Sequence, residues 1–284
     1  MRKSFFLASI LFLACMLLPF CPASAEKEQE AIVIAAFGTS VDSARSSYMN
    51  VEKEVRAKFP GKTVLWAWTA HSLLQSDNNE VRLSVQQALA KLATDGVKKA
   101  SILSLHVIPG AEYNNLAQTA RAFEGLPKGL EQVRLSHPLL YDVDSLAEVA
   151  KMLVQSAPKE RKATEAMVFV GHGTHHAAGV YYPALQYYLH ALDKNVFVGT
   201  VESSPDLEAV LGNLKANGVR RLWLAPLMTV AGDHAVNDIF GPEKDSWAQS
   251  FIAKGIKVER IAKGLGEYPV FVERMVANLV NSMK

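Results

Sequence analysis

The sequence predicts an α/β fold of two similar halves, each a parallel sheet flanked by helices, with a cleft between the halves. The first observation is an internal repeat without a gap, in which residues 96–112 align with residues 218–234. The second is that Phe37-Gly38-Thr39 matches His172-Gly173-Thr174 where each half opens. The third is an alternation of short apolar runs with amphipathic segments, which is typical of parallel sheets covered by helices. Self-similarity at this scale indicates duplicated structure.

The first 25 residues have the pattern of a cleavable secretory signal peptide. Arg2 and Lys3 precede an apolar run over residues 5–18, and Ala23-Ser24-Ala25 forms a small-residue cleavage site. The apolar run is shorter than the roughly 20 residues that span a membrane. We therefore expect cleavage, a periplasmic location and no stable membrane anchor afterwards, rather than an anchored protein.

Cysteine content and charge exclude several classes of function for the exported chain. Cys15 and Cys21 both lie in the signal segment, so the exported chain has no thiol or disulfide to be affected by an oxidising compartment. Loss of Arg2 and Lys3 lowers Lys plus Arg from 30 to 28, against 28 Asp plus Glu. A near-neutral chain lacks the basic surface that binding to nucleic acid requires. About 259 residues remain, enough for two halves with a substantial core.

The first half is predicted to cover residues 26–160. It begins with a continuous apolar run over residues 31–37, as expected of a strand buried on both faces. A helix over residues 40–59 is stopped by Pro60 and Gly61. Apolar periodicity then predicts strands at 63–68, 100–105 and 132–136, and helices at 79–94, 114–123 and 144–155.

A polar stretch over residues 156–164, which contains Pro158, marks the boundary, and the second half covers residues 161–284. It repeats the plan of the first half. Strands are predicted at 166–170, 196–201, 222–227 and 257–261, and helices at 181–192, 206–216, 246–253 and 269–283.

Three side chains stand where strands of this plan end. His172 ends the first strand of the second half, His234 follows the third strand, and Glu112 aligns with His234 in the repeat. Ligands of doubly wound sheets bind beyond the carboxyl ends of the strands. Two imidazoles and a carboxylate bind a divalent transition metal and leave a position open for a substrate. We predict these three residues as metal ligands and catalytic groups; the alternative is that each histidine is a hydrogen-bonded structural residue.

The sequence leaves the roles of two aspartates and one further histidine open. Asp233 and Asp238 flank the second predicted histidine ligand, and either one could orient its ring or cap the following helix. His106 either lines the cleft or is a satisfied histidine near the core. His175 and His176 are expected to be solvated on the rim.

Three segments carry a resemblance to a known family. Residues 104–113, 168–176 and 226–238 resemble the anaerobic, class II cobaltochelatases, which insert cobalt into sirohydrochlorin without ATP during cobalamin synthesis. The similarity covers nearly the whole exported chain. It implies two α/β domains with a tetrapyrrole in the cleft between them. It also implies metal-binding residues at Glu112, His172 and His234.

The resemblance implies insertion of Co²⁺ or Fe²⁺ into sirohydrochlorin or a related tetrapyrrole, here outside the cytoplasm and by a homo-oligomer. One alternative is a periplasmic carrier of haem or another tetrapyrrole on the same fold. Another is a periplasmic small-molecule binding protein, which would not need the three metal ligands. Haem could also be an accessory ligand, because the chain has spare histidines: His71, His137, His175, His176 and His190.

Overall fold

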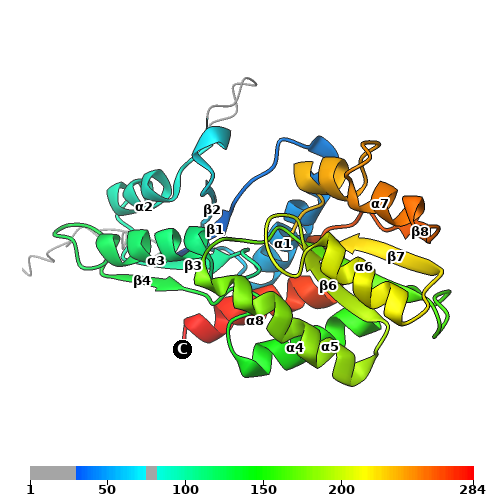
Figure 1. Cartoon of the computed structure of the whole chain (residues 1–284). Coiled ribbons are helices and arrows are strands. Elements are labelled where there is room, and N and C mark those ends of the chain that lie inside the picture. The colour runs from blue at the N-terminus through cyan, green and yellow to red at the C-terminus, as the bar shows by residue number, and fades with distance from the viewer. Residues whose placement is uncertain (1–29, 75–81) are drawn as a thin grey trace, which may run out of the picture.

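Two four-stranded parallel sheets form the centre of the molecule, seen in the computed structural model of Figure 1, which describes residues 30–74 and 82–284. The first sheet has the order β2-β1-β3-β4 and the second the order β6-β5-β7-β8. The strands are β1 (Glu30–Ala36), β2 (Val64–Trp68), β3 (Lys99–Ser104), β4 (Gln132–Leu135), β5 (Ala166–Gly171), β6 (Val196–Thr200), β7 (Arg221–Pro226) and β8 (Lys257–Arg260). The same order in both sheets confirms the predicted duplication, and each predicted strand is found with its ends shifted by at most one residue.

Helices flank both sheets. The α-helices are α1 (Arg45–Lys58), α2 (Val85–Thr94), α3 (Ala111–Phe123), α4 (Val143–Gln155), α5 (Tyr181–Leu192), α6 (Leu207–Ala216), α7 (Trp247–Ala253) and α8 (Pro269–Ser282). Short 3₁₀ turns are η1 (Asp42–Ala44), η2 (His71–Leu73), η3 (Ala177–Val180) and η5 (Leu265–Glu267), and η4 (Ala235–Ile239) is a π-helix. The fold class predicted from the sequence is therefore confirmed.

Three helix starts differ from the prediction. Helix α1 begins at Arg45, not at residue 40, and the 3₁₀ turn η1 precedes it. Helix α2 begins at Val85, not at residue 79, and residues 79–81 lie outside the described residues. Ser84 and Gln87 form a reciprocal capping box, with the Gln87 amide donating to the Ser84 hydroxyl over 3.2 Å. Such a box satisfies two otherwise unpaired N–H groups and starts a helix more definitely than apolar spacing does. Helix α3 begins at Ala111, three residues before the predicted start, so Glu112 lies in its first turn.

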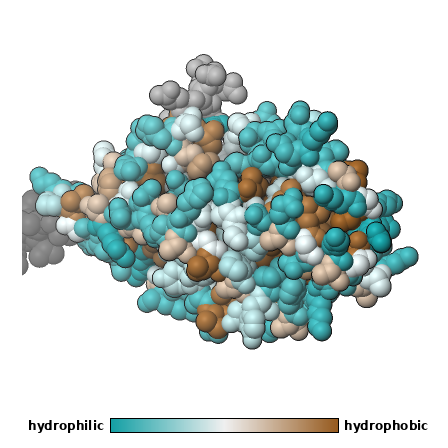
Figure 2. All heavy atoms as spheres, viewed as in Figure 1, coloured by the Kyte–Doolittle hydropathy of each residue, from teal (hydrophilic) through white to brown (hydrophobic). Residues whose placement is uncertain are grey.

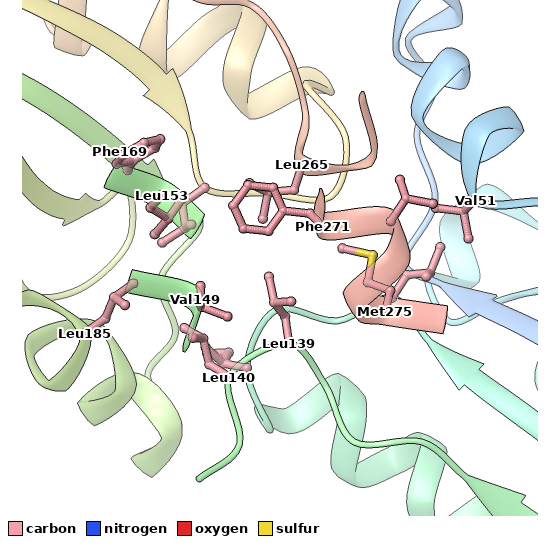
Figure 3. Packing of buried hydrophobic residues seen from close by; sticks show 14 of the residues in the cluster. Val51, Leu139, Leu140, Val149, Leu153, Phe169, Leu185, Leu265, Phe271 and Met275 are labelled. Atoms are coloured by element: carbon pink, nitrogen blue, oxygen red, sulfur yellow. The ribbon is translucent and has the colours of Figure 1, made fainter. Parts of the chain in front are cut away.

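The two halves exchange their last helices in space. Helix α4 packs on α5 of the second half, whereas α8, the last element of the chain, packs on β3 and α1 of the first. Figure 3 shows Phe271 and Met275 of α8 between Val51 of α1 and Phe169 of β5. The predicted boundary thus falls between α4 and β5 along the chain, while one hydrophobic cluster joins both halves.

The face drawn in Figure 2 is largely hydrophilic, and its hydrophobic residues form small separate groups. Within residues 30–74 and 82–284, no helix combines the length and apolar character that a membrane crossing requires. The predicted signal peptide over residues 1–25 lies outside the described residues. The homo-oligomer stays a prediction.

Candidate metal centre

Three neighbouring strands of the second sheet bring three side chains together. Strand β5 lies between β6 and β7. His172 follows β5, Glu202 lies just beyond β6, and His234 lies on the loop after β7. Their ligand-capable atoms all lie within 4.8 Å of one another. We call His172, Glu202 and His234 the metal cluster.

The ring of His234 is oriented by the turn that follows it. His234 precedes the π-helix η4, and Asp238 stands one turn later on the same side. Its Nδ1 lies 2.7 Å from Oδ2 of Asp238. Because a carboxylate accepts, neutral His234 carries its proton on Nδ1 and presents the lone pair of Nε2 to the site. Of the two aspartates left open above, Asp238 orients the ring, while Asp233 accepts a hydrogen bond from Asn237.

The tautomer of His172 follows from the same reasoning. Its Nδ1 lies 3.1 Å from the carbonyl oxygen of Gly173 and 3.4 Å from Oε2 of Glu202. Both oxygens accept, so neutral His172 also presents Nε2 as a ligand. The centroids of the His172 and His234 rings lie 4.3 Å apart, with the rings nearly perpendicular.

Gly173 allows the loop after β6 to approach His172. Its φ of +90° is in the region that side chains disfavour, and a Cβ atom there would lie 2.8 Å from Oγ of Ser203 and 3.1 Å from the amide nitrogen of Glu202. That amide donates to the carbonyl of His172 over 2.9 Å. The position of Glu202 beside the histidines therefore depends on a glycine at 173.

The metal cluster has the size and openness of a site that binds and releases an ion. Ligands around a tetrahedral ion at about 2.1 Å lie roughly 3.4 Å apart, so small side-chain rotations would close the cluster around a metal. The side chains of His172, Glu202 and His234 are 42%, 43% and 35% exposed. With its three ligands this exposed, an ion in the cluster would keep one side accessible to a substrate molecule.

Glu112 is not part of the metal cluster. It is half-buried in the first turn of α3 and lines a polar cavity of about 380 Å³ on the first half, together with Trp68, Thr69 and His71. The structure thus brings together two of the three predicted residues. Glu112 is the repeat equivalent of His234. The repeat therefore places it after β3 of the first sheet, whereas His234 follows β7 of the second sheet.

Sequence reasoning missed Glu202. The sequence does contain an indication of this site. Glu202 directly follows the strand predicted at 196–201, just as His172 follows a predicted strand. The repeat aligns His234 with Glu112 and so favours Glu112 as the third ligand. Adjacent strand ends within one sheet are the stronger criterion, since parallel strands place their carboxyl ends at one edge.

The other histidines within the described residues are not members of the metal cluster. His106 is held near the core by Ser104, whose Oγ lies 2.9 Å from its Nδ1, and desolvation lowers the pKa of its imidazole to about 4. His137 stacks on Tyr141 with ring centroids 3.7 Å apart. His176 is exposed, as predicted, and its Nδ1 accepts a hydrogen bond from the amide of Ala178.

Sequence comparison identifies relatives over almost the entire described chain. The family model for cobalt chelatase (CbiK) matches residues 30–284. Sirohydrochlorin cobaltochelatase CbiKC of Nitratidesulfovibrio vulgaris is 33% identical over 247 residues, covering 86% of this chain and 87% of the relative. Sirohydrochlorin cobaltochelatase of Salmonella typhimurium is 34% identical over 256 residues, covering 88% and 95%.

Solved structures share the two-domain fold at lower identity. Sirohydrochlorin chelatase SirB of Bacillus subtilis subspecies spizizenii, in complex with cobalt, superposes with a TM-score of 0.57 at 10% identity and covers 89% of this chain and 95% of its own. CbiX, described as the terminal enzyme of sirohaem biosynthesis in denitrifying bacteria, has a TM-score of 0.54 at 15% identity, covering 89% and 99%. Given the family match and the two curated relatives, the chain belongs to the CbiK cobalt chelatase family.

Proposed function

We propose that this protein is an ATP-independent chelatase that inserts Co²⁺, or alternatively Fe²⁺, into sirohydrochlorin. The observation that carries the proposal is the metal cluster, two histidines and a carboxylate at adjacent strand ends, in a chain of the CbiK family. The names of the two curated relatives support the substrate and the metal. The predicted carrier function and the small-molecule binding function require no such cluster.

The chemistry exchanges two protons for one divalent metal. His172 and His234 present Nε2 lone pairs that hold the incoming ion, and Glu202 offsets part of its charge. Two pyrrole N–H bonds of the substrate break heterolytically, and their electron pairs become bonds to the metal. The imidazoles that release the metal regain lone pairs and accept the protons, which pass to water. No electron is transferred, so the exchange needs no redox partner, and its balance of protons and metal includes no ATP.

Single substitutions in the metal cluster test the proposal. The purified protein is incubated anaerobically with sirohydrochlorin and Co²⁺ or Fe²⁺, and insertion is followed by absorbance. His172→Ala and His234→Ala should each lower the insertion rate by at least about 100-fold, because each removes a metal ligand. His175→Ala is the matched control and should stay within about twofold of wild type. Normal insertion by both cluster variants would refute this mechanism.

We also propose that the protein acts in the periplasm after removal of residues 1–25. The signal-peptide pattern of the sequence supports this location. Mass spectrometry of the protein recovered from a periplasmic extract should find Glu26 at the amino terminus. Recovery of an intact amino terminus from the soluble cytoplasmic fraction would contradict the proposal.

Accessory haem binding stays a prediction for the spare histidines. Protein purified from haem-replete cells should then show a Soret band, and the absence of that band would count against haem as a ligand. Of the five histidines, His137 and His176 already have stacking or hydrogen-bond partners, and His190 packs edge-on against Phe197.

A further inference from the structure

Glu202 lies on a loop, and its carboxylate must stay beside His172 for the metal cluster to bind an ion. The side chain of Glu202 is 43% exposed. An exposed glutamate loses conformational freedom when it is fixed at a metal, and this loss weakens binding. A backbone that is already held in place makes the loss smaller. The groups that hold the loop after β6 therefore affect the affinity of the metal cluster.

The backbone pairing of β5 with β6 continues beyond the two strands. The Glu202 amide donates to the carbonyl of His172 over 2.9 Å, so the loop after β6 runs beside the loop after β5. The chain then turns back, because the Thr200 amide donates to the carbonyl of Pro205 over 2.7 Å. Residues 201–204 thus form a closed turn that contains the carboxylate ligand.

Ser203 connects this turn to the loop after β5. Its Oγ lies 3.2 Å from the amide nitrogen of Thr174 and 3.2 Å from Oγ1 of Thr200. An amide N–H only donates, so the Ser203 hydroxyl accepts the bond from Thr174. Oγ1 of Thr200 lies 3.3 Å from the carbonyl oxygen of Pro205, which only accepts. The Thr200 hydroxyl therefore donates to Pro205 and accepts from Ser203, and the bonds form one chain with a single direction.

The two loops approach each other most closely at Ser203. A Cβ atom at Gly173 would lie 2.8 Å from Oγ of Ser203 and 2.9 Å from its amide nitrogen. In the chain, the ligand His172 directly precedes Gly173, and the ligand Glu202 directly precedes Ser203. The hydrogen bond between Ser203 and Thr174 therefore fixes the spacing of the two loops that carry these ligands.

We infer that Ser203 is a positioning residue of the metal cluster, whose hydroxyl holds Glu202 beside the histidines and so raises the affinity for Co²⁺. The inference rests on the proposed function, in which Co²⁺ is the substrate metal. In this role Ser203 acts through Glu202 and not as a ligand. Groups that orient ligands from outside the coordination shell typically contribute about 10- to 100-fold in metal affinity.

The test measures Co²⁺ affinity by calorimetric titration of the purified protein, and the ligand set of bound Co²⁺ by its visible absorption spectrum. The main variants are Ser203→Ala, Glu202→Gln and the double variant that combines them. Thr200→Val removes the acceptor of the Ser203 hydroxyl while it keeps the shape of the side chain. Ser282→Ala is the matched control, because it removes a serine hydroxyl that bonds the Leu279 carbonyl on α8.

Ser203→Ala should raise the Kd for Co²⁺ by roughly tenfold, Thr200→Val should raise it by at least about threefold, and the control should not change it. The spectrum of Co²⁺ bound to Ser203→Ala should shift toward that of Glu202→Gln, because the carboxylate is bound for less of the time. The double variant is the decisive case. If Ser203 acts through Glu202, adding Ser203→Ala to Glu202→Gln should change the Kd by less than about twofold.

Two results would overturn the positioning role of Ser203 and leave the proposed function standing. One is an unchanged Kd for Co²⁺ in Ser203→Ala. The other is a loss of affinity that is equally large in the Glu202→Gln background, which a general structural role of the hydroxyl predicts. The proposed function fails in a different way. If wild type binds Co²⁺ and the two substitutions are coupled, but sirohydrochlorin is not metallated, the chelatase function is wrong and the role of Ser203 in metal binding stands.

Discussion

Glu202 and Glu112 are the two carboxylates with distinct proposed roles. Glu202 belongs to the metal cluster and lies 3.4 Å from His172, whereas Glu112 lines a separate cavity on the first half. A carboxylate within the cluster lowers the charge of the bound ion directly. Glu112 lies outside the cluster, so we expect it to act on delivery of the metal and not on its equilibrium binding.

Substitution of the two carboxylates should therefore have separable effects. Glu202→Gln should weaken equilibrium binding of Co²⁺ by roughly 10- to 100-fold, because it removes the anionic ligand. Glu112→Gln should leave that affinity and the affinity for sirohydrochlorin within about twofold, and lower the insertion rate at limiting Co²⁺. Calorimetric titration with Co²⁺ measures the metal affinity of each variant, and fluorescence titration with sirohydrochlorin measures its affinity for the tetrapyrrole. Equal loss of Co²⁺ affinity in both variants would place Glu112 among the resting ligands.

His106 makes the stability of the protein depend on pH. Desolvation lowers the pKa of its imidazole to about 4, whereas the unfolded chain has a histidine pKa near 6.5. Between these values the unfolded state binds a proton that the folded state does not, so the free energy of unfolding falls as pH falls from 6.5 to 4. The loss from this one group is up to roughly 3 kcal/mol.

Urea denaturation at several pH values tests this dependence. Wild type should lose stability steadily from pH 6.5 to 4, and His106→Gln should show a shallower slope over the same interval. His190, whose pKa desolvation also lowers, adds to the slope in both proteins, so the comparison isolates His106. Identical slopes in the two proteins would contradict the assignment.

At the scale of elements, the π-helix η4 positions the ring of His234, a predicted metal ligand. It follows His234 directly, and its turn places Asp238 at 2.7 Å from the His234 ring. Helical segments with an extra residue per turn are found frequently at functional sites. The hydrogen bond to Asp238 thus fixes the tautomer and the ring orientation of His234, although His234 itself lies on a loop.

Asp238→Asn should weaken Co²⁺ affinity by roughly 10- to 100-fold without removing a ligand, because the ring loses its carboxylate partner. Asp233→Asn is the control, since Asp233 hydrogen-bonds Asn237 and lies on the same element boundary. Competition with a chromophoric cobalt chelator measures the Co²⁺ affinity of both variants. If Asp233→Asn weakened binding as much as Asp238→Asn, the effect would belong to the loop as a whole.

At the scale of the molecule, the exchange of helices makes the halves interdependent. Helix α8 is contributed by the end of the chain but packs on the first sheet, and Phe271 on it is fully buried in the cluster shared by both halves. Neither half can lose its folded structure without exposing apolar surface of the other. We expect the two halves to unfold in a single cooperative transition.

Phe271→Ala should lower the free energy of unfolding by about 3–5 kcal/mol, the usual result of emptying a buried aromatic site. Calorimetry should show one transition that moves to lower temperature as a unit. Val270→Ala, at the neighbouring and 37% exposed position, should change stability by less than about 1 kcal/mol. Two separated transitions in the Phe271 variant would show that the halves fold independently.

Much of the fold and part of the site could be predicted from the sequence. Strand limits followed from apolar runs, because a strand buried on both faces leaves few polar positions. The histidines at 172 and 234 followed from their place at strand ends. The start of α2 was missed because a capping box, and not apolar spacing, sets it. Glu202 was missed because the repeat pairs His234 with a carboxylate of the other half and contains no equivalent of Glu202.

The sequence by itself determined the secondary structure, the duplication and the two histidines, since each of these depends on local periodicity or on a motif that can be compared along the chain. Only the tertiary structure decided which carboxylate joins the histidines, how α4 and α8 are exchanged, and that Ser203 links the loops after β5 and β6. The physical reason is that these contacts depend on how loops return between distant elements. Many arrangements of loops are compatible with the same local pattern, and burial of the shared core selects one of them.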